Sequence, residues 1–129
     1  MKKITILLVI IFTFLFSTTS WGEWNYVVTS VIGDKFYYDK DRVRKSGKYL
    51  YFWVLTDFLK PIQEYFSSIY YRELDCSIFR YKDLKETFYK KSMGEGESRT
   101  LENPPDKWRY PQPKSSYESL FNKICEEHQ

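Results

Sequence analysis

The segment 48–58 constrains the fold more than any other part of this chain, because it is apolar at nearly every position. Large apolar side chains occupy both alternating sets of positions, with Tyr49, Tyr51, Trp53 and Leu55 on one and Leu50, Phe52 and Val54 on the other. Successive side chains of a strand point to opposite faces of a sheet. A strand with this pattern has to be covered on both faces, so we predict a central β-strand here.

Shorter strands are predicted on both sides of this segment. Residues 24–32 and 35–39 are rich in Val and aromatic residues and are separated by a Gly33-Asp34 turn. Residues 40–47 are charged and predict a loop, and 67–76 predicts another strand. Two segments stay ambiguous on pattern alone. Residues 57–66, with Pro61, fit either a loop or a short helix, and 77–91 fits either a helix or a strand.

The C-terminal third begins with the turn-forming sequence 93–96 and a brief edge strand near 98–101. The proline-containing segment 103–112 predicts an extended crossing segment anchored by Trp108. Ser115 and Glu118 then have the spacing of a capping box. After it, Tyr117, Leu120, Phe121 and Ile124 recur at helical spacing and predict a helix with one apolar stripe.

The first 22 residues have the three-part pattern of a secretory signal peptide: basic start, short apolar run and small residues. The apolar run would rise only about 20 Å as a helix, short of a bilayer core of about 30 Å. We therefore prefer a cleaved signal, with cleavage between Gly22 and Glu23, to an uncleaved membrane anchor. No cysteine lies near this point, so we expect neither a lipid nor another stable membrane anchor on the mature chain, residues 23–129.

The two cysteines, Cys76 and Cys125, both lie in the predicted mature chain. Export takes them to a compartment where disulfides persist, so we predict one intramolecular bond, with free thiols and an intermolecular bridge as the alternatives. Because Cys125 lies one turn after Phe121, a bond to Cys76 would hold the apolar face of the helix on the sheet. The chain-entropy relation predicts that such a bond adds about 4 kcal/mol to the free energy of unfolding.

Composition argues against most catalytic and nucleic-acid-binding classes. The one histidine, His128, lies at the chain end, so a Ser-His or Cys-His nucleophilic site and a zinc site are both disfavoured. We predict no enzymatic activity, no catalytic residues, no metal and no cofactor. The formal charge of +3 falls to about +1 without Lys2 and Lys3, which gives no argument for a nucleic-acid partner.

A set of residues in a fixed order resembles a known family, the surface-adhesin protein E domains of Gram-negative bacteria. The matching positions are Trp24, Tyr37-Tyr38-Asp39, Phe52-Trp53-Val54-Leu55-Thr56-Asp57, Ser67, Leu74-Asp75-Cys76, Arg80, Met93-Gly94-Glu95-Gly96, Trp108, Pro113, Ser115-Ser116 and Cys125. The resemblance implies a single α+β domain over residues 23–129. It also implies an antiparallel sheet of about five to six strands, with a C-terminal helix pinned to it by the Cys76–Cys125 disulfide. It favours a strand for 77–91.

Named members of this family act as adhesins that bind host matrix proteins, so the resemblance predicts a non-enzymatic binding module. The best-known member is lipid-anchored. Because this sequence has no cysteine for such an anchor, a periplasmic accessory role with a bacterial envelope partner is the alternative, and the location is predicted as periplasm, secreted or cell surface.

The aromatic surplus suggests where a partner would bind. One helix covers only one face of a sheet, so we predict that the other face, with Tyr49, Tyr51 and Trp53, meets a protein partner or a second copy in a homodimer. The competing interpretation is that loops such as 57–66 fold over that face.

Overall fold

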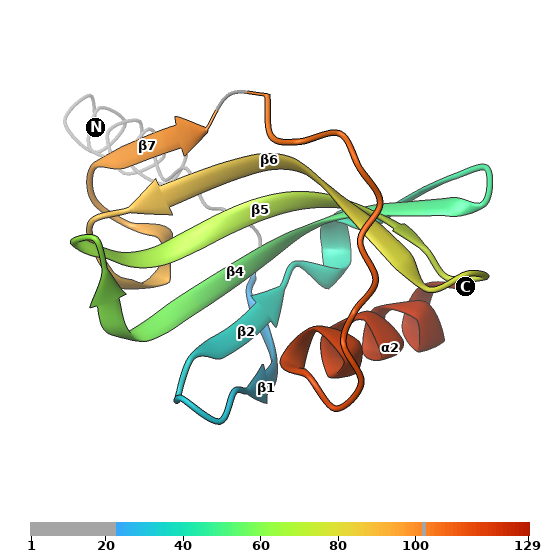
Figure 1. Ribbon diagram of the computed structural model, residues 1–129, viewed down its shortest axis with the longest axis horizontal. Helices are drawn as coiled ribbons and strands as arrows, with labels where there is room; N and C mark the ends of the chain where they lie inside the picture. The colour runs from blue at the N-terminus through green and yellow to red at the C-terminus, as the bar shows by residue number, and fades with distance from the viewer. Residues whose placement is uncertain (1–22, 102) are drawn as a thin grey trace, which may run out of the picture.

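A computed structural model describes residues 23–101 and 103–129, and the predicted signal peptide and its cleavage site at Gly22 lie outside this part. One antiparallel sheet dominates the structure (Figure 1). Its strands are β1 (Asn25–Thr29), β2 (Lys35–Tyr38), β3 (Arg44–Ser46), β4 (Tyr49–Ile62), β5 (Tyr65–Asp75), β6 (Arg80–Tyr89) and β7 (Ser98–Leu101). Short 3-10 turns, η1 (Lys40–Arg42) and η2 (Ser92–Gly94), and the helix α2 (Ser116–His128) complete the fold.

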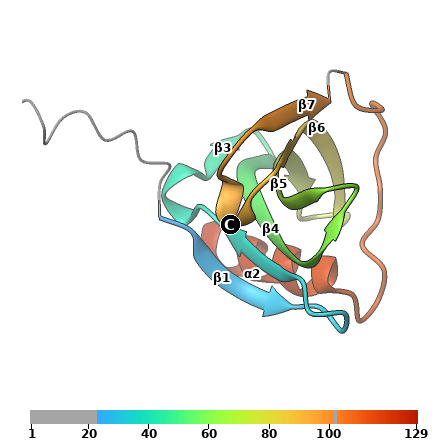
Figure 2. The same cartoon turned by 90° about the vertical axis from the view of Figure 1, so that its left-hand side faces the viewer.

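The strands follow the order β1-β2-β4-β5-β6-β7, and β3 pairs with the first part of β4. The predicted antiparallel sheet with a C-terminal helix is therefore confirmed. The short strand β3 lies in the charged segment that was predicted as a loop. Seen from the side, the sheet is strongly curved, and α2 lies beside β1 and β2 (Figure 2). No helix of residues 23–101 and 103–129 is long and apolar enough to cross a membrane.

Strand β4 lies at the centre of the sheet, as its pattern predicts. Leu50, Phe52 and Val54 are at most 2% exposed and belong to the core beneath α2, with Leu120 and Phe121 of the helix. These buried side chains occupy one face of β4, since alternate residues of a strand share a face. The odd-numbered residues of β4 occupy the opposite face, which α2 does not cover.

The segment 57–66 is neither a loop nor a helix. It forms the end of a β-hairpin in which β4 and β5 continue to the pair Ile62 and Tyr65. Gln63 and Glu64 make the two-residue connection, and both have positive φ, 50° and 73°. Pro61 is tolerated because the regular pairing of β4 with β5 is interrupted between Asp57 and Ile62. The second ambiguous segment contains strand β6, as the family resemblance favours.

Helix α2 begins where its capping residues predict. The Ser115 hydroxyl accepts a hydrogen bond from the Glu118 N–H at 3.2 Å, whereas the Glu118 carboxylate accepts from the Lys114 N–H instead of closing the capping box on Ser115. Cys125 is bonded to Cys76, which directly follows β5, with the two Cα atoms 5.9 Å apart. The disulfide therefore joins the helix to the end of a central strand.

Candidate functional site

The face of the sheet opposite α2 carries a cluster of large aromatic side chains. We define the aromatic face by four residues of β4 and β5: Tyr49, Tyr51, Trp53 and Tyr71. Trp53 pairs with Tyr71 across the two strands, and their ring centroids are 4.6 Å apart. The Tyr51 and Tyr71 rings are stacked at 6.3 Å. The three rings therefore form one continuous aromatic surface.

Two other parts of the chain cover the ends of this face. At one end, η2 lies against Leu55 and Ile69, which are at most 1% exposed. A side chain at Gly94 would place its Cβ 2.8 Å from Ile69 Cδ1, so only glycine permits this close approach of the backbone. At the other end, the Trp108 ring lies 5.5 Å from the Tyr49 ring. Between these covers, the rings of Tyr51, Trp53 and Tyr71 remain partly exposed.

Trp108 is held in place by cations as well as by Tyr49. The Arg80 guanidinium lies 4.2 Å and the Lys82 ammonium 4.6 Å from the centre of the indole. Backbone hydrogen bonds between Tyr81 and Arg109, both 2.8 Å, attach the 103–112 segment to the edge of β6. The prediction that Trp108 anchors an extended crossing segment agrees with these contacts.

Polar groups surround the open part of the aromatic face. The Arg44 guanidinium lies 4.6 Å from the Tyr51 ring centre, and its Nη2 donates a hydrogen bond of 3.5 Å to the Tyr71 hydroxyl. The Tyr51 hydroxyl donates to Glu73, and this bond raises the pKa of Tyr51 to about 12. The hydrogen bond to Tyr71 raises the pKa of Arg44 above its ordinary value. At neutral pH the face therefore presents the neutral phenol of Tyr51 beside a permanent cation.

The structure places the three residues predicted for an interaction face together on one surface. Residues 57–66 continue the β4–β5 hairpin, and the segments that lie against the ends of this face are η2 and the one that contains Trp108. Sequence reasoning missed Tyr71, Glu73 and Arg44. The alternation of large side chains in 67–76 was the available signal for Tyr71, but its position opposite Trp53 depends on the register of the hairpin.

Catalytic groups do not gather on this face. Among residues 23–101 and 103–129, no group of three or more His, Cys, Asp or Glu side chains is arranged to hold a metal ion. His128 lies at the end of α2, where its ring contacts Tyr38 edge-on. What the face offers chemically is a row of stacked and tilted aromatic rings, with hydrogen-bonding hydroxyls and a guanidinium at its border.

Comparison with known proteins identifies similar folds. The sequence model of surface-adhesin protein E matches residues 24–126. A structure of Haemophilus influenzae protein E, crystal form II, superposes with a TM-score of 0.65 at 15% identity, covering 86% of this chain and 93% of that one. A second structure of the same protein gives a TM-score of 0.62 at 15% identity, with 86% and 89% covered. No curated protein sequence matches the chain.

Proposed function

The chain belongs to the surface-adhesin protein E family, and on this premise we propose that it is an exported, non-enzymatic adhesin that binds an extracellular protein through the aromatic face. The family assignment supports the class of function. The structure contributes the surface on which such binding would take place.

The observation that carries this proposal is the partly exposed aromatic cluster at the centre of the aromatic face. Tyr51, Trp53 and Tyr71 lie between the ends of the face that η2 and Trp108 cover, and all three are partly exposed. Tyr, Trp and Arg are the residues that most often dominate the binding energy of protein interfaces. Their rings are large and lose little conformational freedom, while the hydroxyls of Tyr51 and Tyr71 and the guanidinium of Arg44 supply polar contacts at the border.

The partner class follows from the same surface. The face combines apolar rings with charged groups at its border: Glu73 is bonded to Tyr51, Arg44 is bonded to Tyr71, and Lys85 lies opposite Tyr71 on the neighbouring strand. Such a surface favours a folded protein with a complementary apolar patch over a highly charged polymer. Host matrix proteins are the partners that the family suggests, and we propose one of them as the ligand.

Two measurements test this proposal. First, external protease should cleave the protein on intact cells; protection until the outer membrane is ruptured would contradict surface display and support a periplasmic role. Second, the purified mature chain should bind at least one member of a panel of immobilised matrix proteins with saturation.

Light scattering of the same sample adds a control for self-association. A stable dimer that Trp53→Glu converts to a monomer would show that a second copy occupies the aromatic face. That result would contradict the assignment of the face to a host protein.

A further inference from the structure

The turn between β1 and β2 presents two aliphatic side chains at its apex. Both views of the ribbon place this turn at the outer margin of the molecule (Figure 1, Figure 2). Val31 is fully exposed, and Ile32 is 70% exposed. Turn positions are usually occupied by Gly, Pro, Asn, Asp or Ser. Two β-branched apolar residues at this apex contribute nothing to the core, and exposed apolar groups that gather in one place mark interaction sites.

The turn is held in one conformation by three hydrogen bonds. The Gly33 N–H donates to the Ser30 carbonyl at 3.0 Å. This bond makes Val31 and Ile32 the central pair of a β-turn. The Ser30 N–H donates to the Asp34 carbonyl at 2.8 Å, and the Asp34 N–H donates to the Ser30 hydroxyl at 3.1 Å. The backbone that displays the two apolar side chains is therefore ordered before any partner binds, which lowers the cost of binding.

The β4–β5 hairpin enlarges this apolar surface. Leu59 is 64% exposed, and its side chain lies so close to Gly33 that a Cβ there would be 2.6 Å from Leu59 Cδ2. The Leu59 N–H also donates to Asp34 Oδ1 at 3.0 Å, which ties the hairpin to the turn. We define the aliphatic tip by Val31, Ile32 and Leu59.

Charges around the aliphatic tip cancel. Lys35 and Lys60 are exposed and form no ion pair within the described part of the chain. The neighbouring carboxylates each bond to another group of the protein: Asp34 to the Leu59 N–H, Asp57 to the Met93 N–H and Glu64 to the Lys90 ammonium. Lys35, Lys60 and Lys90 thus balance three carboxylates. The two free ammonium groups lie on flexible stems, which can reach a polar layer while apolar neighbours lie deeper.

We propose that the aliphatic tip inserts reversibly into the headgroup region of a phospholipid bilayer. Val, Ile and Leu are among the residues that enter a bilayer most favourably, whereas Leu and Val are under-represented among the residues that dominate protein interfaces. A projecting turn also suits a fluid layer, because such a layer needs no preformed pocket to receive it. Since the surrounding charges cancel, insertion depends on apolar contact and not on attraction to anionic lipid.

The expected affinity is low. The three side chains of the tip contain fewer carbon atoms than a myristoyl chain, which binds bilayers with an association constant of about 10⁴ M⁻¹. We expect a constant of about 10³ M⁻¹, so half of the protein is bound at about 1 mM lipid. This contact orients the protein on a membrane without being a stable anchor. Met93 of η2 is bonded to Asp57, so η2 lies between the tip and the open rings of the aromatic face. The outcome of the test is therefore independent of the proposed adhesin role.

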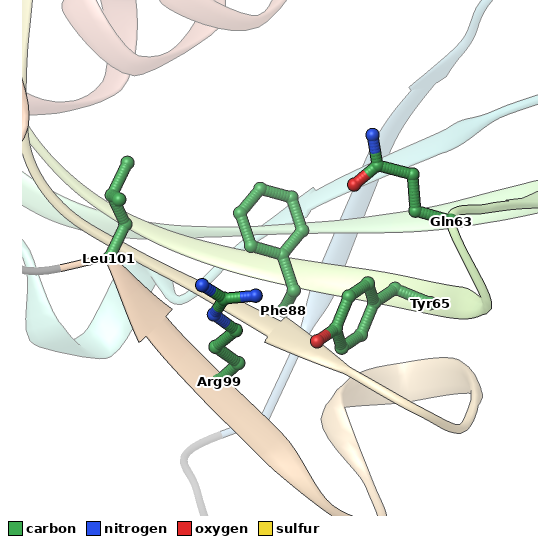
Figure 3. A pocket seen from close by; sticks show the side chains of 5 residues that line it. All are labelled: Gln63, Tyr65, Phe88, Arg99 and Leu101. Atoms are coloured by element: carbon green, nitrogen blue, oxygen red, sulfur yellow. The ribbon is translucent and has the colours of Figure 1, made fainter.

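A second copy of the chain is the alternative occupant. Figure 3 shows a hollow of about 260 Å³ in which Tyr65, Phe88 and Leu101 form apolar walls, with Gln63 and Arg99 beside them. A tip that entered this hollow on another copy would make a head-to-tail contact. Repetition of such a contact gives a ring or an open polymer, which light scattering detects.

The test is flotation of the mature protein with vesicles of three parts phosphatidylethanolamine and one part phosphatidylglycerol. About half of the protein should float at about 1 mM lipid, and about 0.5 M NaCl should change this fraction little. Absence of binding at about 5 mM lipid would overturn the proposal. Binding that disappears at high salt would also overturn it, in favour of electrostatic adsorption. Self-association without lipid that Val31→Asp abolishes would assign the tip to a second copy instead.

Single substitutions supply the site control. Val31→Asp and Ile32→Asp should each weaken vesicle binding by about tenfold or more, because a carboxylate is costly to insert. Ile78→Asp, which removes a 53% exposed apolar side chain at the opposite end of the sheet, should weaken it by less than about twofold. Nitroxide-labelled lipid in the vesicles should broaden the amide NMR signal of Leu59 more than that of Ile78. Equal binding of the Val31→Asp and Ile78→Asp variants, or equal broadening at the two amides, would overturn the proposal.

Discussion

Asp83→Asn should destabilise the domain far more than its small change in shape suggests, because it removes the charge that compensates a buried arginine. The Arg72 side chain is 2% exposed, and its Nε donates to Asp83 Oδ1 at 2.7 Å. Its Nη2 donates to the Tyr117 hydroxyl at 2.9 Å. Its Nη1 is buried with no hydrogen-bond partner. Arg72 therefore has no spare contact that could replace Asp83.

The charge of Arg72 persists after the change. The guanidinium of an arginine is not deprotonated in proteins, so Arg72 keeps its positive charge when Asp83 is lost. Aromatic rings surround the guanidinium at 4.6–5.7 Å from the centroids of Tyr70, Tyr81, Tyr117 and Phe121. These rings stabilise the cation only in part, since a cation–π contact contributes about 0.5–2 kcal/mol.

Breaking a buried ion pair by removing one partner costs about 3–5 kcal/mol. Domains of this size have a total free energy of unfolding of about 5–15 kcal/mol. With a urea m-value of about 2 kcal/mol/M, the midpoint of unfolding should fall by about 1.5–2.5 M. The assay is equilibrium urea denaturation with the disulfide intact, followed by tryptophan fluorescence.

Two further variants make this prediction refutable. Asp106→Asn breaks an exposed pair with Lys82, in which Asp106 is 86% exposed, and should change the free energy of unfolding by less than about 0.5 kcal/mol. Replacing both buried partners, Arg72→Met with Asp83→Leu, should recover most of the loss. If Asp83→Asn costs no more than Asp106→Asn, or the double variant is no more stable than Asp83→Asn, the reasoning is wrong.

Two other predictions concern the end of β5. Replacing Cys76 and Cys125 together by Ser should lower the free energy of unfolding by about 4 kcal/mol, given their separation of 49 residues, and a loss under 1 kcal/mol in urea denaturation would contradict this. Hydrogen bonds from Ser77, and then from Arg80, hold the pKa of buried Asp75 below its ordinary value. The stabilisation that ionised Asp75 provides is therefore present above about pH 4. It is lost as the pH falls through the lowered pKa that Asp75 has in the folded state. Asp75→Asn should flatten the dependence of Tm on pH below pH 5, and a pH profile parallel to that of the unchanged protein would exclude this role.

Local and strongly periodic features were predictable from the sequence. The helix 116–128 follows from its Ser115 cap and apolar stripe, which depend on residues within a few positions of each other. The central position of β4 follows from its two apolar faces. The disulfide follows from two cysteines in an exported chain, with the resemblance indicating the same pairing.

The hairpin at 57–66 was not predictable, because its local sequence does not have the pattern of a hairpin. Apolar residues there recur at helical spacing, and the connection uses Gln63 and Glu64, where a two-residue hairpin turn normally requires Gly or Asn. Pairing of β4 with β5 overrides that local preference. The polar border of the aromatic face was missed because Arg44 and Glu73 approach Tyr51 only through the registers of β3 and β5 against β4.

The most direct test of the central claim is the affinity of Trp53→Ala for the matrix protein that the unchanged chain binds. If the aromatic face is the binding surface, this central ring is a dominant contact and its loss should weaken binding at least 30-fold, equivalent to about 2 kcal/mol. Phe66→Ala, which removes a 40% exposed aromatic ring elsewhere, is the matched control and should weaken binding less than threefold. Both variants should unfold in urea with midpoints close to that of the unchanged protein. An affinity of folded Trp53→Ala within threefold of the unchanged protein would contradict the account.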